Sequence, residues 1–206
     1  MIYLLRHGEI AGSKIRRFIG QTDVELSPRG IDQAQFWQKY FADIKIDCIY
    51  SSPLSRCIET AKVVSGPPYE SDQVIIIPEL AEIDLGEWDG RTFKEIKKNF
   101  PMAWEQRGKD LANYRPPGGE SFADLFDRVV PAFHDIICQN KGNTLIVAHA
   151  GVNRMILCNL FAKKIKEMFT IGQAYGCLNI IRKPKRMGDE TAVVSACNLA
   201  PGLHFL

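Results

Sequence analysis

The sequence predicts an α/β protein, with a largely parallel sheet covered by helices as a three-layer α/β/α sandwich. Short β-rich runs alternate with longer helical patterns along the chain, which is typical of β–α–β units. The chain has 206 residues, 46% of them hydrophobic and 24% charged, the balance of an ordinary globular domain. We therefore expect residues 1–206 to form a single domain with an inserted helical lobe at about residues 85–140.

The chain opens with an apolar strand over residues 2–5 and then enters a loop rich in glycine and charge, as far as Leu26. A loop of this length is usually functional. A helix is predicted from Ser27 and Pro28 to about residue 42, because Ser caps helix N-termini and Pro suits the first helical turn.

A second strand is expected over residues 47–50, and Ser51-Ser52-Pro53 repeats the combination of capping residue and proline. That combination predicts a helix that starts near Pro53 and carries Arg56 in its first turn. A third strand is expected over residues 73–77, where Pro78 ends it.

Between about residues 85 and 140 the pattern changes to two or three helical stretches. Pro101 and the turn-rich residues 113–119 interrupt them, and Ser121 then caps a long amphipathic helix. We interpret this whole region as the inserted lobe.

The strongest strand of the chain is predicted over residues 144–148, and it runs into His149 and a helix over roughly residues 152–163. Residues 177–181 and 192–197 are expected to form the closing strands, with a polar turn between them. This completes the sheet.

Composition excludes several classes of function. The formal net charge of +2 is too small to indicate a nucleic-acid partner. No apolar run approaches the roughly 20 residues that span a bilayer, and Arg6 interrupts the N-terminal run before a signal peptide could form. The six cysteines are scattered without a CxxC pair and are interpreted as buried thiols. We expect a cytoplasmic protein with no membrane partner, and a homodimer is left open.

Two of the four histidines, His7 and His149, directly follow apolar strands. The carboxyl ends of the strands in an open α/β sheet are where ligands bind, and Arg56 in its helix can reach the same edge. Each residue alone has an ordinary structural explanation, as a buried histidine or a solvated arginine. Arg6, Arg56 and the two imidazoles together predict a pocket for a dianion, most simply a phosphate.

Four ordered blocks of the chain, at residues 5–9, 51–61, 82–90 and 147–151, resemble the histidine phosphatase, or phosphoglycerate mutase-like, superfamily. The tripeptide Arg6-His7-Gly8 alone is a weak signal, but four blocks in the right order are specific. Residues 17–23 and 26–30 also resemble α-ribazole phosphatases of cobalamin assembly, which is a less specific signal.

The resemblance implies that His7 attacks phosphorus to form a phosphohistidine, while Arg6, Arg56 and His149 hold the phosphoryl group. It implies no metal and no cofactor. Chemistry agrees with these roles, because a cation-lined pocket keeps an imidazole neutral and therefore nucleophilic. Positioning and charge neutralisation by the arginines supply what phosphoryl transfer otherwise needs.

The resemblance also implies a carboxylic acid that protonates the leaving oxygen, and the family pattern falls on Glu82. The sequence does not show which carboxylate is desolvated, so nearby acids stay open. These competitors are Glu79, Asp84 and Glu87.

The sequence departs from the family at one loop. Many members carry an Asn a few residues beyond Arg-His-Gly, where this chain has Ser13, Lys14 and Arg16. Ser13, Gln21 or Thr22 is expected to supply the missing phosphate contact. The lobe also has no obvious basic pair for a second phosphate, and only Arg107, Lys109 and Arg115 could substitute for one.

The leading hypothesis is a metal-independent phosphomonoesterase of a small phosphorylated metabolite, with α-ribazole 5′-phosphate favoured. A phosphoglycerate mutase or broad-specificity phosphatase on the same scaffold is the first alternative, and a non-catalytic phospho-ligand binding module is the second. A metal hydrolase is disfavoured because the histidines lack an HxxxH pattern or a carboxylate-rich cluster.

Overall fold

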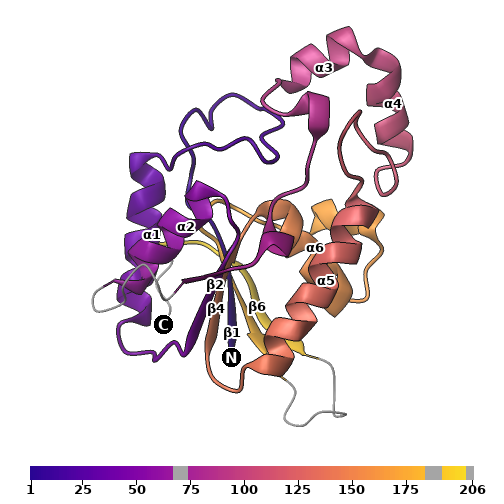
Figure 1. Ribbon diagram of the computed structural model, residues 1–206. Coiled ribbons are helices and arrows are strands. Elements are labelled where there is room, and N and C mark those ends of the chain that lie inside the picture. The colour runs from indigo at the N-terminus through magenta and orange to yellow at the C-terminus, as the bar shows by residue number, and fades with distance from the viewer. Residues whose placement is uncertain (67–73, 184–191, 203–206) are drawn as a thin grey trace.

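The computed structural model describes residues 1–66, 74–183 and 192–202, and within them a six-stranded sheet forms the centre (Figure 1). The strands lie in the order β3-β2-β4-β1-β5-β6. Their bounds are β1 Ile2–Arg6, β2 Cys48–Ser51, β3 Val74–Ile76, β4 Thr144–Ala148, β5 Leu178–Arg182 and β6 Val193–Leu199. The first four are parallel to one another, and β5 is antiparallel to both of its neighbours. The prediction of a largely parallel sheet is therefore confirmed.

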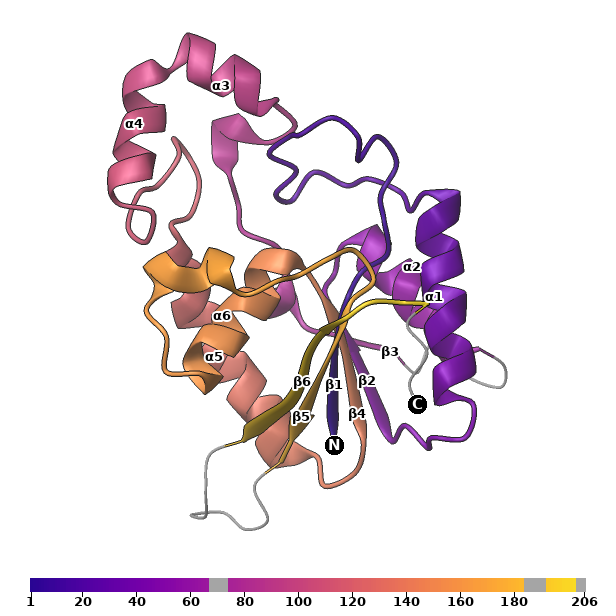
Figure 2. The ribbon, with the colours of Figure 1, turned by 180° about the vertical axis from the view of Figure 1, so that it is seen from behind.

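Helices cover both faces of the sheet. The pair α1 (Pro28–Phe41) and α2 (Ser55–Ser65) lies on one face, and α5 (Phe122–Gln139) and α6 (Ala150–Leu160) lie on the other, as Figures 1 and 2 show from opposite sides. Side chains of β1 alternate between the two cores: Ile2 and Leu4 pack in one, Tyr3 and Leu5 in the other. The α/β/α class predicted from the sequence is confirmed.

Of the three helix starts predicted from a capping serine, two are confirmed. The Ser27 hydroxyl accepts a hydrogen bond from the Gly30 backbone N–H at 3.1 Å, and Ser121 forms a reciprocal capping box with Asp124. The start of α2 is two residues later than predicted. Ser52 does not cap this helix, because its hydroxyl lies 2.7 Å from Nε2 of His149 at the edge of the sheet.

The lobe is smaller than predicted. It contains α3 (Phe93–Asn99) and α4 (Pro101–Lys109), which extend beyond the end of the sheet (Figure 1). The helix α5 instead belongs to the layer beside the sheet, where Leu125, Val129 and Phe133 are fully buried in the core. An amphipathic pattern predicts a helix with one buried face, but it does not show which element covers that face.

Short 3₁₀ helices lie at Pro78–Leu80, Gly86–Trp88 and Ile165–Thr170. The polar turn predicted between the last two strands falls largely on residues 184–191, which lie outside the described residues. None of the helices in the described part of the chain is long and apolar enough to cross a membrane.

Candidate active site

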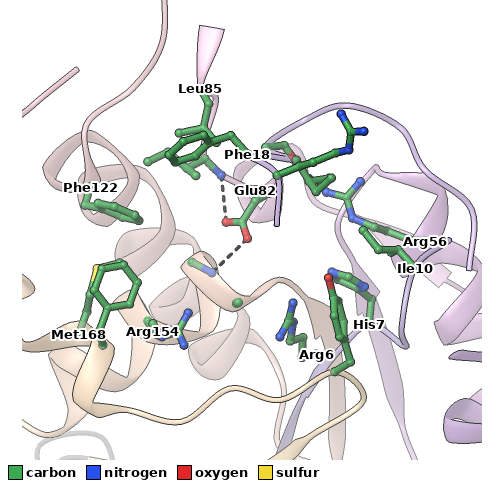
Figure 3. A pocket seen from close by; sticks show the side chains of 18 of the residues that line it. Arg6, His7, Ile10, Phe18, Arg56, Glu82, Leu85, Phe122, Arg154 and Met168 are labelled. Atoms are coloured by element: carbon green, nitrogen blue, oxygen red, sulfur yellow. Dashed lines mark hydrogen bonds between the residues drawn. The ribbon is translucent and has the colours of Figure 1, made fainter. Parts of the chain in front are cut away.

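A cavity of about 300 Å³ opens at the carboxyl ends of the neighbouring strands β1 and β4, the place where ligands bind in open α/β sheets (Figure 3). Its walls come from segments far apart in the sequence. The charged lining residues are Arg6, Arg17, Arg56, Glu82, Arg107 and Arg154. His7 and several aromatic side chains complete the lining, so the cavity combines a strongly basic character with apolar walls.

His7 follows β1 and is buried, with 4% of its surface exposed. Its Nδ1 lies 2.8 Å from the carbonyl oxygen of Gly8, and a carbonyl only accepts, so Nδ1 carries the proton of the neutral ring. This tautomer leaves a lone pair on Nε2. Burial, followed by the charges of Arg6 and Arg56, lowers the pKa of His7 well below its usual value, so the imidazole is neutral at neutral pH.

Arg56 reaches the cavity from the first turn of α2 and is 1% exposed. Its Nη2 and Nη1 donate to the backbone carbonyls of Gly20 and Thr22, each at 2.8 Å. Gly20 has a φ of +49°, and a Cβ there would lie 1.9 Å from an Asp89 carboxylate oxygen, so only glycine fits. The glycine-rich loop therefore holds the Arg56 guanidinium in place.

Arg6 at the end of β1 donates from Nη1 to the Gln173 carbonyl at 2.6 Å. The Nε of Arg6 and the Nε of Arg56 are both buried and have no hydrogen-bond partner. An unpaired buried donor on a cation is costly, and most such groups in folded proteins are satisfied. The two guanidinium groups thus retain unused hydrogen-bonding capacity beside the cavity.

His149 directly follows β4, is the N-cap residue of α6 and is fully buried. Its ring centroid lies 5.1 Å from that of His7, although His149 is not one of the cavity-lining residues. Burial lowers the pKa of His149 well below its usual value, and His7 and Arg56 act in the same direction. The two histidines are therefore neighbouring neutral imidazoles.

Glu82 is the carboxylate that lines the cavity, and Figure 3 shows its two hydrogen bonds. One oxygen accepts from the backbone N–H of Ile83 at 3.0 Å, and the other accepts from that of Gly151 in the first turn of α6 at 3.1 Å. The competitors Glu79, Asp84 and Glu87 do not line the cavity. Of the four acids considered from the sequence, only Glu82 lines the cavity that His7 also lines.

Gly151 makes room for Glu82, which leads to a testable prediction. A Cβ at Gly151 would lie 2.3 Å from a carboxylate oxygen of Glu82. Gly151→Ala should displace this carboxylate and lower kcat/KM by about tenfold to a hundredfold, since misplacing a reacting group by about 1 Å has that effect. Steady-state rates on an alkyl phosphate would measure the loss.

Gly108→Ala is the matched control, because a Cβ at Gly108 in α4 meets nothing within 4 Å. Its rates should equal those of the wild type. Equal rates for Gly151→Ala and the wild type would contradict the assigned position of Glu82.

The three polar loop residues expected to contact phosphate do not line the cavity. Gln21 donates from Nε2 to the backbone carbonyl of Glu82 at 3.0 Å, and Thr22 offers its carbonyl to Arg56. Ser13 is half-buried in the same loop. Gln21 and Thr22 therefore support other site residues.

Of the lobe residues considered for a second anion, only Arg107 lines the cavity. Arg115 is paired with Asp124, with 2.6 Å between Nη2 and Oδ1. Lys109 is exposed and does not line the cavity.

Arg154 and Tyr175 are among the lining residues that sequence reasoning missed, together with Arg17 and several apolar side chains. Arg154 lies three residues after Gly151 on α6, so helical spacing placed it on the same face and could have indicated it. Tyr175 lies in the segment between the last 3₁₀ helix and β5, where no periodicity gives a signal. Among the described residues, no three His, Cys, Asp or Glu side chains form a group that could hold a metal ion.

Known proteins of one family are similar to this chain over most of its length. The family model described as histidine phosphatase superfamily (branch 1) matches residues 2–195. The human 6-phosphofructo-2-kinase/fructose-2,6-bisphosphatase 4 is 34% identical over 81% of this chain but only 34% of its own length. This chain thus spans about a third of that relative.

Two proteins of similar length match almost end to end. Phosphoserine phosphatase 1 of Hydrogenobacter thermophilus is 26% identical over 96% of this chain and 93% of its own. A crystal structure of the α-ribazole phosphatase from Shigella flexneri superimposes with a TM-score of 0.87 at 27% identity and covers 98% of both chains. With the family match extending through both histidine blocks, the chain belongs to the histidine phosphatase superfamily, branch 1.

Proposed function

We propose that this protein is a metal-independent phosphomonoesterase that acts on a small phosphorylated metabolite through a phosphohistidine on His7. One observation supports this most strongly: the unpartnered buried Nε donors of Arg6 and Arg56 lie beside a neutral imidazole with a lone pair on Nε2. A phosphoryl group is an acceptor and an anion, and it satisfies both arginines.

In the first step, Nε2 of His7 attacks phosphorus, and the bond from phosphorus to the ester oxygen breaks. Glu82 gives its proton to the departing oxygen, while Arg6, Arg56 and His149 stabilise the transferring group. In the second step, water attacks the phosphohistidine and Glu82 takes the proton from that water. The phosphorus–nitrogen bond breaks, orthophosphate leaves and His7 is restored.

The favoured substrate is α-ribazole 5′-phosphate. The similarity in fold to the Shigella flexneri enzyme supports it, and the cavity offers Phe18, Phe93, Phe122 and Phe169 to an aromatic leaving group. Phosphoserine is the second candidate, because Arg107 and Arg154 line the cavity without a carboxylate partner among the described residues. Either arginine can bind the carboxylate of that substrate.

A turnover screen tests the function and separates the alternatives. The purified protein is assayed for phosphate release from α-ribazole 5′-phosphate, phosphoserine and 3-phosphoglycerate, with and without a chelator. Phosphate release that a chelator leaves unchanged supports the proposal. Conversion of 3-phosphoglycerate to its isomer without phosphate release would indicate a mutase, and binding without turnover would indicate a non-catalytic module.

Arg107 should select among leaving groups. Its Cζ lies 5.5 Å from the centroid of the Phe18 ring, and burial lowers the pKa of the guanidinium. Arg107→Ala should change the ratio of kcat/KM between phosphoserine and phenyl phosphate by about tenfold to a hundredfold, since a lost charged hydrogen bond costs roughly 1.5–3 kcal/mol.

Arg115→Ala is the matched control in the same lobe, because Arg115 pairs with Asp124 outside the cavity. Its substrate ratio should equal that of the wild type. If Arg107→Ala also keeps the wild-type ratio, the leaving group is selected elsewhere.

A further inference from the structure

Residues 173–177, here called the strap, fasten directly onto the turn that carries the nucleophile. The Gln173 carbonyl accepts from Nη1 of Arg6 at 2.6 Å, and the Gly176 backbone N–H donates to the His7 carbonyl at 3.0 Å. These bonds join residues about 170 positions apart in the sequence. These hydrogen bonds therefore fix the strap relative to Arg6 and His7.

The strap is in turn anchored to the core by buried polar side chains. Gln173 is 5% exposed; its Oε1 accepts from Asn153 Nδ2, and its Nε2 donates to Asn179 Oδ1, both at 2.9 Å. The Trp37 indole N–H donates to the Gly176 carbonyl at 2.6 Å. These buried hydrogen bonds hold the strap in place, although Oδ1 of Asn153 has no hydrogen-bond partner.

Tyr175 projects from the middle of the strap into the cavity. The centroid of its ring lies 3.8 Å from Cζ of Arg6 and 5.6 Å from the ring centroid of His7. We propose that the Tyr175 ring is a positioning residue, which fixes the plane of the Arg6 guanidinium and keeps water from the His7 imidazole. This inference rests on the proposed function of the site.

The contact with Arg6 has a geometric consequence. A guanidinium group donates hydrogen bonds in its own plane, and a ring stacked on its face leaves those donors free. The Nε of Arg6 has no protein partner, so the ring holds this donor in place without competing for it. An aliphatic side chain at position 175 would leave the guanidinium free to rotate.

The contact with His7 acts through solvation. Burial is the largest cause that lowers the pKa of His7, and the charges of Arg6 and Arg56 lower it further. The ring of His149 also lies against that of His7. Removing the Tyr175 ring admits water, which stabilises the protonated imidazole. The pKa of His7 should then rise, so less of the nucleophile is neutral at a given pH.

Tyr175→Phe and Tyr175→Ala separate the ring from its hydroxyl. With phenyl phosphate as the probe, Tyr175→Phe should keep most of the wild-type kcat/KM and the position of the acid limb, because it loses only the hydrogen bond between the Tyr175 hydroxyl and Arg6. Tyr175→Ala should lose about tenfold to a hundredfold in kcat/KM, and the acid limb of its profile should move to higher pH. The ionisation of phenyl phosphate affects all variants equally, so a difference in the acid limb between variants reports an ionisation of the protein.

A second readout does not depend on turnover. Diethyl pyrocarbonate modifies neutral imidazoles, and mass spectrometry of the peptide containing His7 gives its rate of modification against pH. The half-maximal pH should rise in Tyr175→Ala and stay unchanged in Tyr175→Phe. Tyr175→Leu, which keeps an apolar side chain, replaces the alanine variant if thermal unfolding shows that it does not fold.

Several outcomes would overturn the inference. Loss of rate in Tyr175→Ala with an unmoved acid limb and an unmoved modification profile would refute the shielding of His7 from water, and a wild-type rate in Tyr175→Ala would refute the positioning of Arg6. Equal damage from Tyr175→Phe would assign the effect to the hydroxyl. Failure of the proposed function is distinguishable, because then the wild-type protein itself would neither release phosphate nor form a phosphohistidine.

Discussion

His7→Ala should abolish turnover, with a loss of at least about 10⁴-fold in kcat, because no other described side chain replaces a nucleophile of this kind. His7 alone combines a place in the cavity, a proton fixed on Nδ1 and a lone pair on Nε2. After a rapid quench with a ³²P-labelled phosphomonoester, the wild type should carry an acid-labile, base-stable label on His7. The variant should carry none.

His134→Ala is the control for this experiment. His134 lies exposed on α5, where its Nε2 is 3.2 Å from the Asn159 amide nitrogen, and it does not line the cavity. The His134→Ala variant should hydrolyse the substrate at the wild-type rate and carry the same ³²P label on His7. A labelled His7→Ala protein, or one with wild-type rates, would refute the phosphohistidine mechanism.

The sequence predicted the part of the site that follows strands. His7 and His149 come directly after β1 and β4, and these strands pair in parallel, so the two rings had to meet at one edge of the sheet. Arg56 was predicted for a similar reason, since it lies in the first turn of the helix that follows the neighbouring strand β2. Strand ends are where local sequence and topology together determine position.

The rest of the site depends on contacts between segments without any repeating pattern. Tyr175 reaches His7 only because the strap hydrogen-bonds to the end of β1, and nothing in the local sequence encodes that pairing. The predicted boundary of the lobe was wrong for a related reason. The apolar face of α5 was recognised from the sequence, but the element that covers it is the sheet. Which element covers an apolar helix face depends on tertiary structure and not on the helix pattern itself.

This chain lacks the Asn that many family members carry beyond Arg-His-Gly, and the contacts of the same loop show what the loop does in this structure. Sequence reasoning sought a substitute side chain among Ser13, Gln21 and Thr22, whereas the loop contributes mainly backbone. The carbonyls of Gly20 and Thr22 orient Arg56, and the Gln21 amide holds the backbone of Glu82. Gln21 and Thr22 therefore support Arg56 and Glu82, and the charged side chain that this loop itself brings to the cavity is Arg17.

Glu82→Gln should slow poor leaving groups far more than good ones. An alkyl phosphate should lose about 10²- to 10³-fold in kcat, while an aryl phosphate such as p-nitrophenyl phosphate should lose less than about tenfold, because a phenolate of low pKa needs little proton donation. The amide keeps one oxygen to accept from Gly151 or Ile83, so the position of the side chain is largely retained. The two rates on one enzyme preparation give the ratio directly.

Glu87→Gln is the matched control, because Glu87 is exposed on the same segment and does not line the cavity. Its ratio between the alkyl and the aryl substrate should equal that of the wild type. If Glu82→Gln slows both substrates equally, Glu82 binds or supports the site without donating a proton, since loss of a proton donor must depend on the leaving group. Asp84, which is half-buried two residues further along the chain, would then be the next carboxylate to test in the same way.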